Sequence, residues 1–250
     1  MSLPSFAIRR VVRRIRGGSS SPLVVETDGG MFVAKLRGAG QGAPAVVAEL
    51  VVGSLADALG LPTPERVLLE LLPNVETLDK NDELADLLAR SVGTNVGVRW
   101  LEGAREPREE ELARLDDDFA VAALWLDRFV MNPDRTRHNP NVVLWKAQPW
   151  LIDHGAALAF QHRWSAVTEA SPRDDEPLRD HVFEARAPRL VEYDAALAAR
   201  LDRRVLERAI ELVPDDILES ADVAATATRR RAAYQAFLWK RLRPPRPFIR

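Results

Sequence analysis

Two aspartates and an asparagine lie close together in the stretch NPDRTRHNPNVVLWKAQPWLIDHG, from Asn132 to Gly155. Asn139 follows Asp134 by five residues, and Asp153 comes after two short apolar runs, VVLW and PWLI. Runs of this kind predict two paired strands, which would bring Asp134 and Asn139 close to Asp153. Carboxylate and amide oxygens are the hard ligands that Mg²⁺ prefers. The stretch therefore predicts a site where a metal ion and a phosphate could meet.

Other residues nearer the N-terminus could serve the same chemistry. Lys35 ends a predicted strand and could neutralise phosphate charge, and Glu49, in the helix that follows, could hold that lysine in place. Backbone N–H groups of a loop of small residues can approach a polyphosphate closely. Such a loop is formed by Gly17, Gly18, Ser19 and Ser20. With an aspartate to orient the attacking hydroxyl, these are the parts that phosphoryl transfer needs.

The order of these parts resembles the protein-kinase-like fold, and within it the HipA-like kinases, whose cores are similar to DRTRHNPN and WLIDHG. The resemblance extends from about Gly17 to Gly155. It implies that Asp134 is the catalytic-loop aspartate and that Asn139 is the metal-binding asparagine of that loop. It also implies that Asp153 takes the place of the aspartate that opens the kinase Asp-Phe-Gly motif.

The resemblance extends to the N-terminal residues and to the ligands. Lys35 looks like the lysine of the third kinase strand, and Glu49 looks like its helix partner. The implied cofactors are ATP and Mg²⁺, and the implied acceptor is a hydroxyl group, of a protein Ser or Thr or of the chain itself. The segment from Val96 to Leu101 would be the hinge beside the adenine, with Val98 and Trp100 at the nucleotide.

Four features depart from the kinase pattern. Asn132 and Pro133 stand where the kinase catalytic loop has His-Arg, GGSSS is not Gly-x-Gly-x-x-Gly, and His154 replaces the usual phenylalanine. Asn141 competes with Asn139 for the metal, although the spacing from Asp134 favours Asn139. These departures leave open a nucleotide-binding pseudokinase or regulatory module that transfers no phosphate.

The surrounding sequence predicts the elements that position these residues. LVVET and MFVAKL around an Asp-Gly-Gly turn predict a β-hairpin over Leu23–Leu36, and a helix follows that ends at Gly60. A second helix is capped by Asn81 or Asp82, and helices fill the chain from about Asp180. The segment SAVTEASPRDDEP, between the Asn132–Gly155 stretch and the C-terminal helices, is typical of an exposed linker. The prediction is an α+β, two-lobed fold with a β-rich lobe over residues 1–95, containing one main helix, and a mostly helical lobe over 96–250.

Composition excludes several other classes of protein. The chain has 250 residues, no cysteine and a formal net charge of −2, so disulfides, thiolate chemistry and a general affinity for nucleic acid are not expected. No apolar run approaches the roughly 20 residues that span a bilayer, and the N-terminus does not resemble a signal peptide. We expect a cytoplasmic protein without a membrane partner.

A metal-dependent hydrolase with His138, Asp153 and His154 as ligands is an enzyme of another class that the sequence allows, although the chain lacks paired histidines. For several neighbouring residues a structural role competes with a functional one. Asp127 could brace the loop or face solvent, and Arg135 could bind phosphate, although an exposed loop arginine is the commoner case. His181 is expected to be structural or on the surface.

Overall fold

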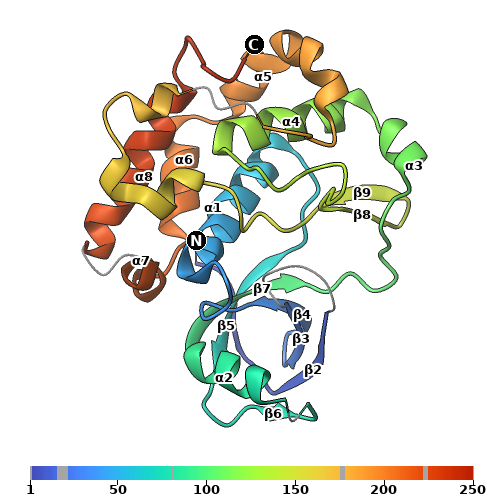
Figure 1. Cartoon of the computed structure of the whole chain (residues 1–250), viewed down its shortest axis with the longest axis vertical. Coiled ribbons are helices and arrows are strands. Elements are labelled where there is room, and N and C mark those ends of the chain that lie inside the picture. The colour runs from blue at the N-terminus through green and yellow to red at the C-terminus, as the bar shows by residue number, and fades with distance from the viewer. Residues whose placement is uncertain (1, 16–21, 80, 175–177, 222–224, 250) are drawn as a thin grey trace.

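The β-rich first part of the chain forms one curled, seven-stranded sheet in the computed structural model (Figure 1). The strand order is β1-β5-β7-β4-β3-β2-β6, and pairing is antiparallel except between β1 and β5 and between β2 and β6. The strands are β1 (Ser5–Ala7), β2 (Arg10–Arg14), β3 (Leu23–Thr27), β4 (Gly30–Lys35), β5 (Arg66–Leu71), β6 (Glu76–Thr77) and β7 (Gly93–Arg99). The structure describes residues 2–15, 22–79, 81–174, 178–221 and 225–249.

The predicted hairpin over Leu23–Leu36 is confirmed. β3 and β4 pair antiparallel, with Thr27 opposite Gly30 across the turn. Gly30 has φ of 107°, a conformation that an L-residue with a side chain avoids. At the other end of β4, Lys35 is the last residue of the strand and lies opposite Val96 of β7.

The rest of the chain is mostly helical, as predicted (Figure 1). A separate hairpin, β8 (Val142–Trp145) with β9 (Gln148–Leu151), confirms the two predicted paired strands. The α-helices are α1 (Gly42–Leu59), α2 (Asp82–Arg90), α3 (Glu109–Ala113), α4 (Asp117–Val130), α5 (Leu190–Arg200), α6 (Arg203–Glu211), α7 (Asp215–Ala221) and α8 (Ala227–Leu242). The 3₁₀ helices among the described residues are η1 (Ala159–Ala166), η2 (Ser171–Arg173) and η3 (Glu184–Arg189).

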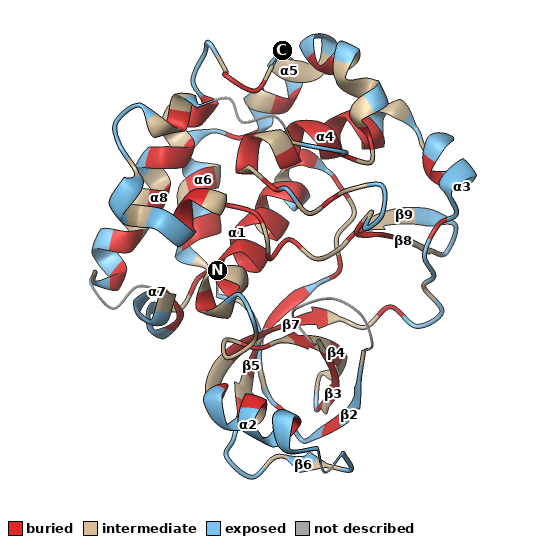
Figure 2. Ribbon diagram, viewed as in Figure 1, coloured by how far each residue is buried: buried red, intermediate tan, exposed pale blue. Residues whose placement is uncertain are grey.

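Helix α1 connects the two parts of the molecule. It ends at Gly60, whose left-handed φ of 79° closes the helix as the sequence predicts. Its buried side chains, such as Val47 and Leu55, belong to the large core shared with the helices, where Figure 2 shows α1 mostly buried. The sheet has a second core, covered by Leu84 and Leu87 of α2. By length and composition α1 could cross a membrane, but 67% of it is buried inside the fold, and this position accounts for its apolar character.

The predicted linker after the β8–β9 hairpin is more ordered than expected where the structure describes it. Its first part continues η1, and η2 packs against α8 with Pro172 buried. Arg241 of α8 donates hydrogen bonds to the carbonyl oxygens of Pro172 and Asp174. Polar contacts with a helix therefore hold this segment, a feature that its composition does not reveal.

The connection between the lobes begins at the end of β7. The boundary predicted after residue 95 lies within this strand, which pairs with β4 on one side and β5 on the other up to Arg99. A second link is made by Arg37, just beyond β4, whose Nη1 donates to Oδ2 of Asp216 in α7 at 2.7 Å. The lobes are thus joined by the chain after Arg99, by α1 and by this ion pair.

Candidate active site

A cavity of about 570 Å³ lies where the sheet meets the helical lobe. Segments distant in sequence line it: the end of β4, the start of α1, the chain after β7 and the loops on both sides of the β8–β9 hairpin. The cavity brings together every predicted site residue that the structure describes, namely Lys35, Glu49, Val98, Trp100, Asp134, Asn139 and Asp153. The predicted phosphate loop of Gly17, Gly18, Ser19 and Ser20 lies outside the described residues and stays a prediction.

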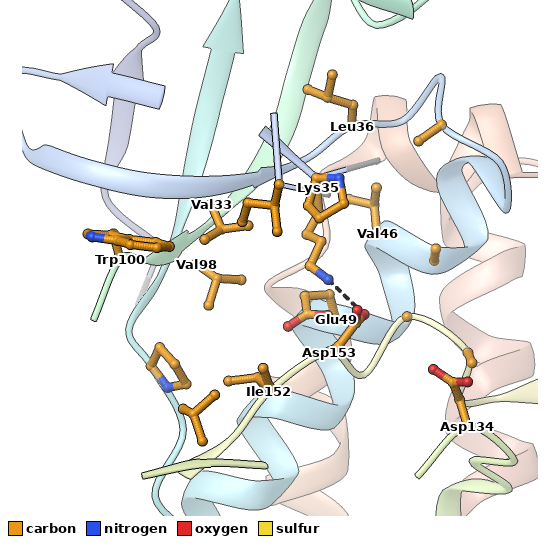
Figure 3. A pocket seen from close by; sticks show the side chains of 18 of the residues that line it. Val33, Lys35, Leu36, Val46, Glu49, Val98, Trp100, Asp134, Ile152 and Asp153 are labelled. Carbon is orange, nitrogen blue, oxygen red and sulfur yellow. Dashed lines mark ion pairs between the residues drawn. The ribbon is translucent and has the colours of Figure 1, made fainter. Parts of the chain in front are cut away.

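Lys35 and Asp153 form an ion pair inside this cavity, with 2.7 Å between Nζ and Oδ1 (Figure 3). Glu49 lies beside them, fully buried in α1, and its Oε2 accepts a hydrogen bond of 2.9 Å from the backbone N–H of His154. The sequence predicts that Glu49 holds Lys35. In the structure the direct partner of Lys35 is Asp153, and Glu49 instead holds the backbone next to Asp153.

Burial and mutual charge set the ionisation of these three groups. Burial lowers the pKa of Lys35, but the charges of Glu49 and Asp153 outweigh it and the pKa lies above its ordinary value. Burial raises the pKa of Glu49 more than Lys35 lowers it. Burial alone would raise the pKa of Asp153, but the charge and the hydrogen bond of Lys35 outweigh it, so the pKa of Asp153 is lowered. The pair of Lys35 and Asp153 is therefore held in its charged form.

Asp134 lies on the loop before β8, where two amides fix its carboxylate. The Nδ2 atoms of Asn139 and Asn141 each lie 3.0 Å from Oδ2 of Asp134. The loop is closed by Thr136, whose backbone N–H donates to the carbonyl oxygens of Asp134 and Asn139. The backbone N–H of Asp134 donates to Oδ1 of Asn132. Asn132, which with Pro133 stands in place of the kinase His-Arg pair, therefore supports the loop.

A buried polar network lies beneath this loop, centred on Asp127 of α4. Its carboxylate accepts from Nδ2 of Asn132 at 2.7 Å, from Nε of Arg135 at 2.5 Å, and from Nε2 of His181 at 3.1 Å. Asp127 and Arg135 are 0% exposed. Asp127 therefore braces the loop, and the expectation of an exposed Arg135 is wrong, because its guanidinium compensates a buried carboxylate.

The sequence carries a signal for this network that its motifs do not show. Asp127 lies in a helix that is buried on nearly all sides, with Trp125, Leu126 and Phe129 around it. A carboxylate inside such a helix needs a buried partner, because an unpaired buried charge is costly. The position of Asp127 thus predicts a cationic partner, although it does not identify Arg135.

Arg135 also connects the loop to the segment after β9 that carries Asp153. Its Nη1 donates to the carbonyl oxygen of Asn141 at 2.5 Å, and its Nη2 lies 3.4 Å from Nδ1 of His154. Burial, with the charge of Arg135 as the next cause, lowers the pKa of His154 from its ordinary 6.5 to about 3. His154 is therefore a neutral, buried part of the framework.

The remaining walls of the cavity are apolar. Val33 and Val98 line it from the sheet, and Ile152 lies across from them, with Trp100 at one end (Figure 3). β7 lies between β4 and β5, so the backbone of Val98 is used within the sheet. The backbone N–H of Trp100 donates to the carbonyl oxygen of Met31. Leu101 is the first residue here whose N–H has no hydrogen-bond acceptor within the part of the chain that the structure describes.

The oxygen donors at the cavity suit a hard divalent cation. Asp153 and Asn139 both line it, and because the NH₂ group of Asn139 faces Asp134, its Oδ1 is left for another partner. Histidine chemistry does not fit in the same way. His138 is exposed and His154 is buried, and the described residues contain no group of three His, Cys, Asp or Glu arranged to hold a metal.

The two lobes and the cavity between them define the fold as one of the kinase type. The crystal structure of a Helicobacter pylori proinflammatory kinase, CtkA, has a similar fold, with a TM-score of 0.56, 11% sequence identity, and coverage of 96% of this chain and 98% of that chain. The sequence matches the family model for HipA-like kinases over residues 8–233. The chain therefore belongs to the HipA-like kinase family. Among curated proteins, a sequence comparison found no significant match.

Proposed function

We propose that the chain is an ATP- and Mg²⁺-dependent kinase that transfers a phosphoryl group to a hydroxyl acceptor. The observation that carries this proposal is that Lys35, Asp134, Asn139 and Asp153 converge from separate segments on one cavity. The acceptor is proposed to be a Ser or Thr of a protein, or of the chain itself, in the cytoplasm. No membrane or nucleic acid takes part in the proposed reaction.

The apolar end of the cavity suits the adenine of ATP. Val33 and Val98 on one side and Ile152 on the other offer apolar contacts for both faces of a ring. The N–H of Leu101, for which no described residue is an acceptor, would supply a hydrogen-bond donor at the edge of that space. Lys35, deeper in the cavity, is held in its charged form and would neutralise phosphate charge.

The oxygens of Asp153 and Asn139 would hold the metal ion. When bound, Mg²⁺ would offset the negative charge that develops on the phosphate oxygens. Oδ1 of Asp153 accepts from Nζ of Lys35, which orients the carboxylate in the cavity. Glu49 holds the backbone beside it through the N–H of His154, which keeps Asp153 at a fixed place in the cavity.

Asp134 would orient the acceptor hydroxyl and take its proton. The two amides occupy Oδ2, whereas no described residue donates to Oδ1. An ionised carboxylate with one oxygen fixed and the other free can accept a hydrogen bond from an incoming hydroxyl. Most of the rate enhancement would come from positioning and electrostatic stabilisation and not from a covalent intermediate.

The direct test is incubation with labelled ATP and Mg²⁺, followed by mass spectrometry of the chain and of added protein acceptors. Asp134→Asn is expected to bind ATP and to lose transfer by about 100-fold or more, since it removes the base. Asp153→Asn is expected to lose both phosphoryl transfer and the Mg²⁺-dependent binding of ATP. Asp86→Asn, an exposed change on α2, serves as the matched control.

The outcomes separate this proposal from its alternative. ATP binding to the wild-type chain without transfer to any acceptor would favour a nucleotide-binding pseudokinase or regulatory module. Equal loss of binding and transfer in Asp134→Asn would give Asp134 a structural role and contradict the mechanism.

A further inference from the structure

Asn141 has an unusual backbone conformation for its place in the fold. It directly precedes β8 with φ of 46°, in the left-handed region that non-glycine residues rarely adopt, and asparagine is among the residues that tolerate it best. Its side chain is 8% exposed, so this is a buried polar residue and not a surface turn. A strained, buried asparagine next to a catalytic loop calls for a specific role.

The side chain of Asn141 acts on Asp134. Its Nδ2 lies 3.0 Å from Oδ2 of Asp134, and since an ionised carboxylate only accepts, the NH₂ group must face it. Asn139 donates to the same oxygen at the same distance. Asn139, however, is exposed and lines the cavity, whereas Asn141 is buried. The two amides therefore share one contact but differ in their access to a ligand.

The backbone of Asn141 acts on the segment that carries Asp153. Its carbonyl oxygen accepts from Nη1 of Arg135 at 2.5 Å and from the backbone N–H of Ile152 at 3.0 Å. Ile152 immediately precedes Asp153. One residue therefore contacts Asp134 through its side chain and the neighbour of Asp153 through its backbone.

We propose that Asn141 is a positioning residue that orients the Asp134 carboxylate and fixes its place relative to Asp153. In this role it is not a metal ligand, and the metal contact of the loop belongs to Asn139. The left-handed backbone is what allows both contacts at once, because it turns the carbonyl group toward Arg135 and Ile152 while the amide faces Asp134. This inference rests on the proposed kinase reaction.

The test is Asn141→Gly, which keeps the left-handed backbone accessible and removes only the amide. We expect kcat to fall about 100-fold, the scale of a misplaced general base, with KM for ATP and the Mg²⁺ requirement within about 3-fold of the wild type. Lys146→Gly is the matched control, because Lys146 also has a left-handed φ, 50°, but lies at the exposed tip of the hairpin. Asn139→Ala should instead raise the Mg²⁺ concentration needed.

Two results would overturn the inference. A higher Mg²⁺ requirement in Asn141→Gly would make Asn141 a ligand, and an unchanged kcat would remove its role. Should Asn141→Gly not fold, Asn141→Asp replaces it, because aspartate also tolerates the left-handed region and its carboxylate would repel Asp134.

A swap experiment keeps the inference testable without transfer activity. If the wild-type chain phosphorylates no acceptor, the proposed function fails, but Asn141→Asp should still lower Tm. Adding Asp134→Asn should restore Tm, because the amide at position 134 would then donate to the carboxylate at position 141. Restoration supports the contact that positions Asp134. A double variant no more stable than Asn141→Asp would contradict it.

Discussion

At the scale of single residues, ionisation in this site depends on burial as much as on partners. Lys35 and Asp153 support each other's charged forms, whereas the pKa of the fully buried Glu49 is raised despite the same lysine nearby. His154 is driven neutral by burial. Residue identity alone therefore does not give the charge of the site, because identical carboxyl groups respond to different surroundings.

The depressed pKa of His154 predicts acid sensitivity. Between pH 6.5 and about 3 the unfolded chain binds a proton at this histidine and the folded chain does not, so stability decreases as pH falls. At about pH 5 the loss relative to neutral pH should reach about 2 kcal/mol. His154→Gln should lack this contribution in urea unfolding measured across the pH range. His162→Gln, an exposed control, should keep the wild-type slope; equal slopes in all three proteins would contradict the assignment.

At the scale of elements, the loop from Asn132 to Asn141 is fixed because contacts hold it both to α4 and to the segment after β9. The connection is the contact of Asp127 with Arg135, and of Arg135 with the carbonyl oxygen of Asn141. Arg135→Met should lower the free energy of unfolding by about 3–5 kcal/mol, because it leaves a buried carboxylate without its cation. Chemical denaturation measures this directly. Arg137→Met, two residues away and exposed, should change stability by less than about 0.5 kcal/mol; similar losses in both variants would contradict the brace.

Most elements follow from local sequence. The Asp28–Gly29 turn between two alternating runs specifies the β3–β4 hairpin, and Gly60 ends α1 as a left-handed cap. Asn81, one of the two caps proposed, accepts hydrogen bonds from the N–H groups of Glu83 and Leu84 at the start of α2. These features depend on residues adjacent in the chain, so the sequence alone predicts them.

The features that the sequence misses depend on distant contacts. Lys35 pairs with Asp153 and not with Glu49 because the fold brings together segments about a hundred residues apart. Arg135 is buried because its loop packs against α4. The types and order of the predicted site residues indicate their chemistry, and those that the structure describes line one cavity. Spacing in the chain does not determine which carboxylate pairs with Lys35, so the sequence does not predict that geometry.

At the scale of the whole molecule, the described chain has two hydrophobic cores. One lies within the sheet and under α2, and the other joins α1 to the helices of the second lobe. The cavity lies between them and takes its lining from both lobes. A ligand in this cavity should therefore stabilise both lobes together, because it adds contacts across their boundary.

This coupling predicts a stabilisation by ATP that requires Mg²⁺. At about 100 times Kd, ligand binding contributes about 2.7 kcal/mol, which for a chain of this size raises Tm by roughly 5–10 °C. Hydrogen exchange should slow both in β4 (Gly30–Lys35) and in the loop from Asp134 to Asn141, which lie in different lobes. EDTA should remove both effects, and Asp153→Asn should show neither. Protection confined to one lobe, or a Tm shift that survives EDTA, would contradict a metal-dependent nucleotide site at the lobe boundary.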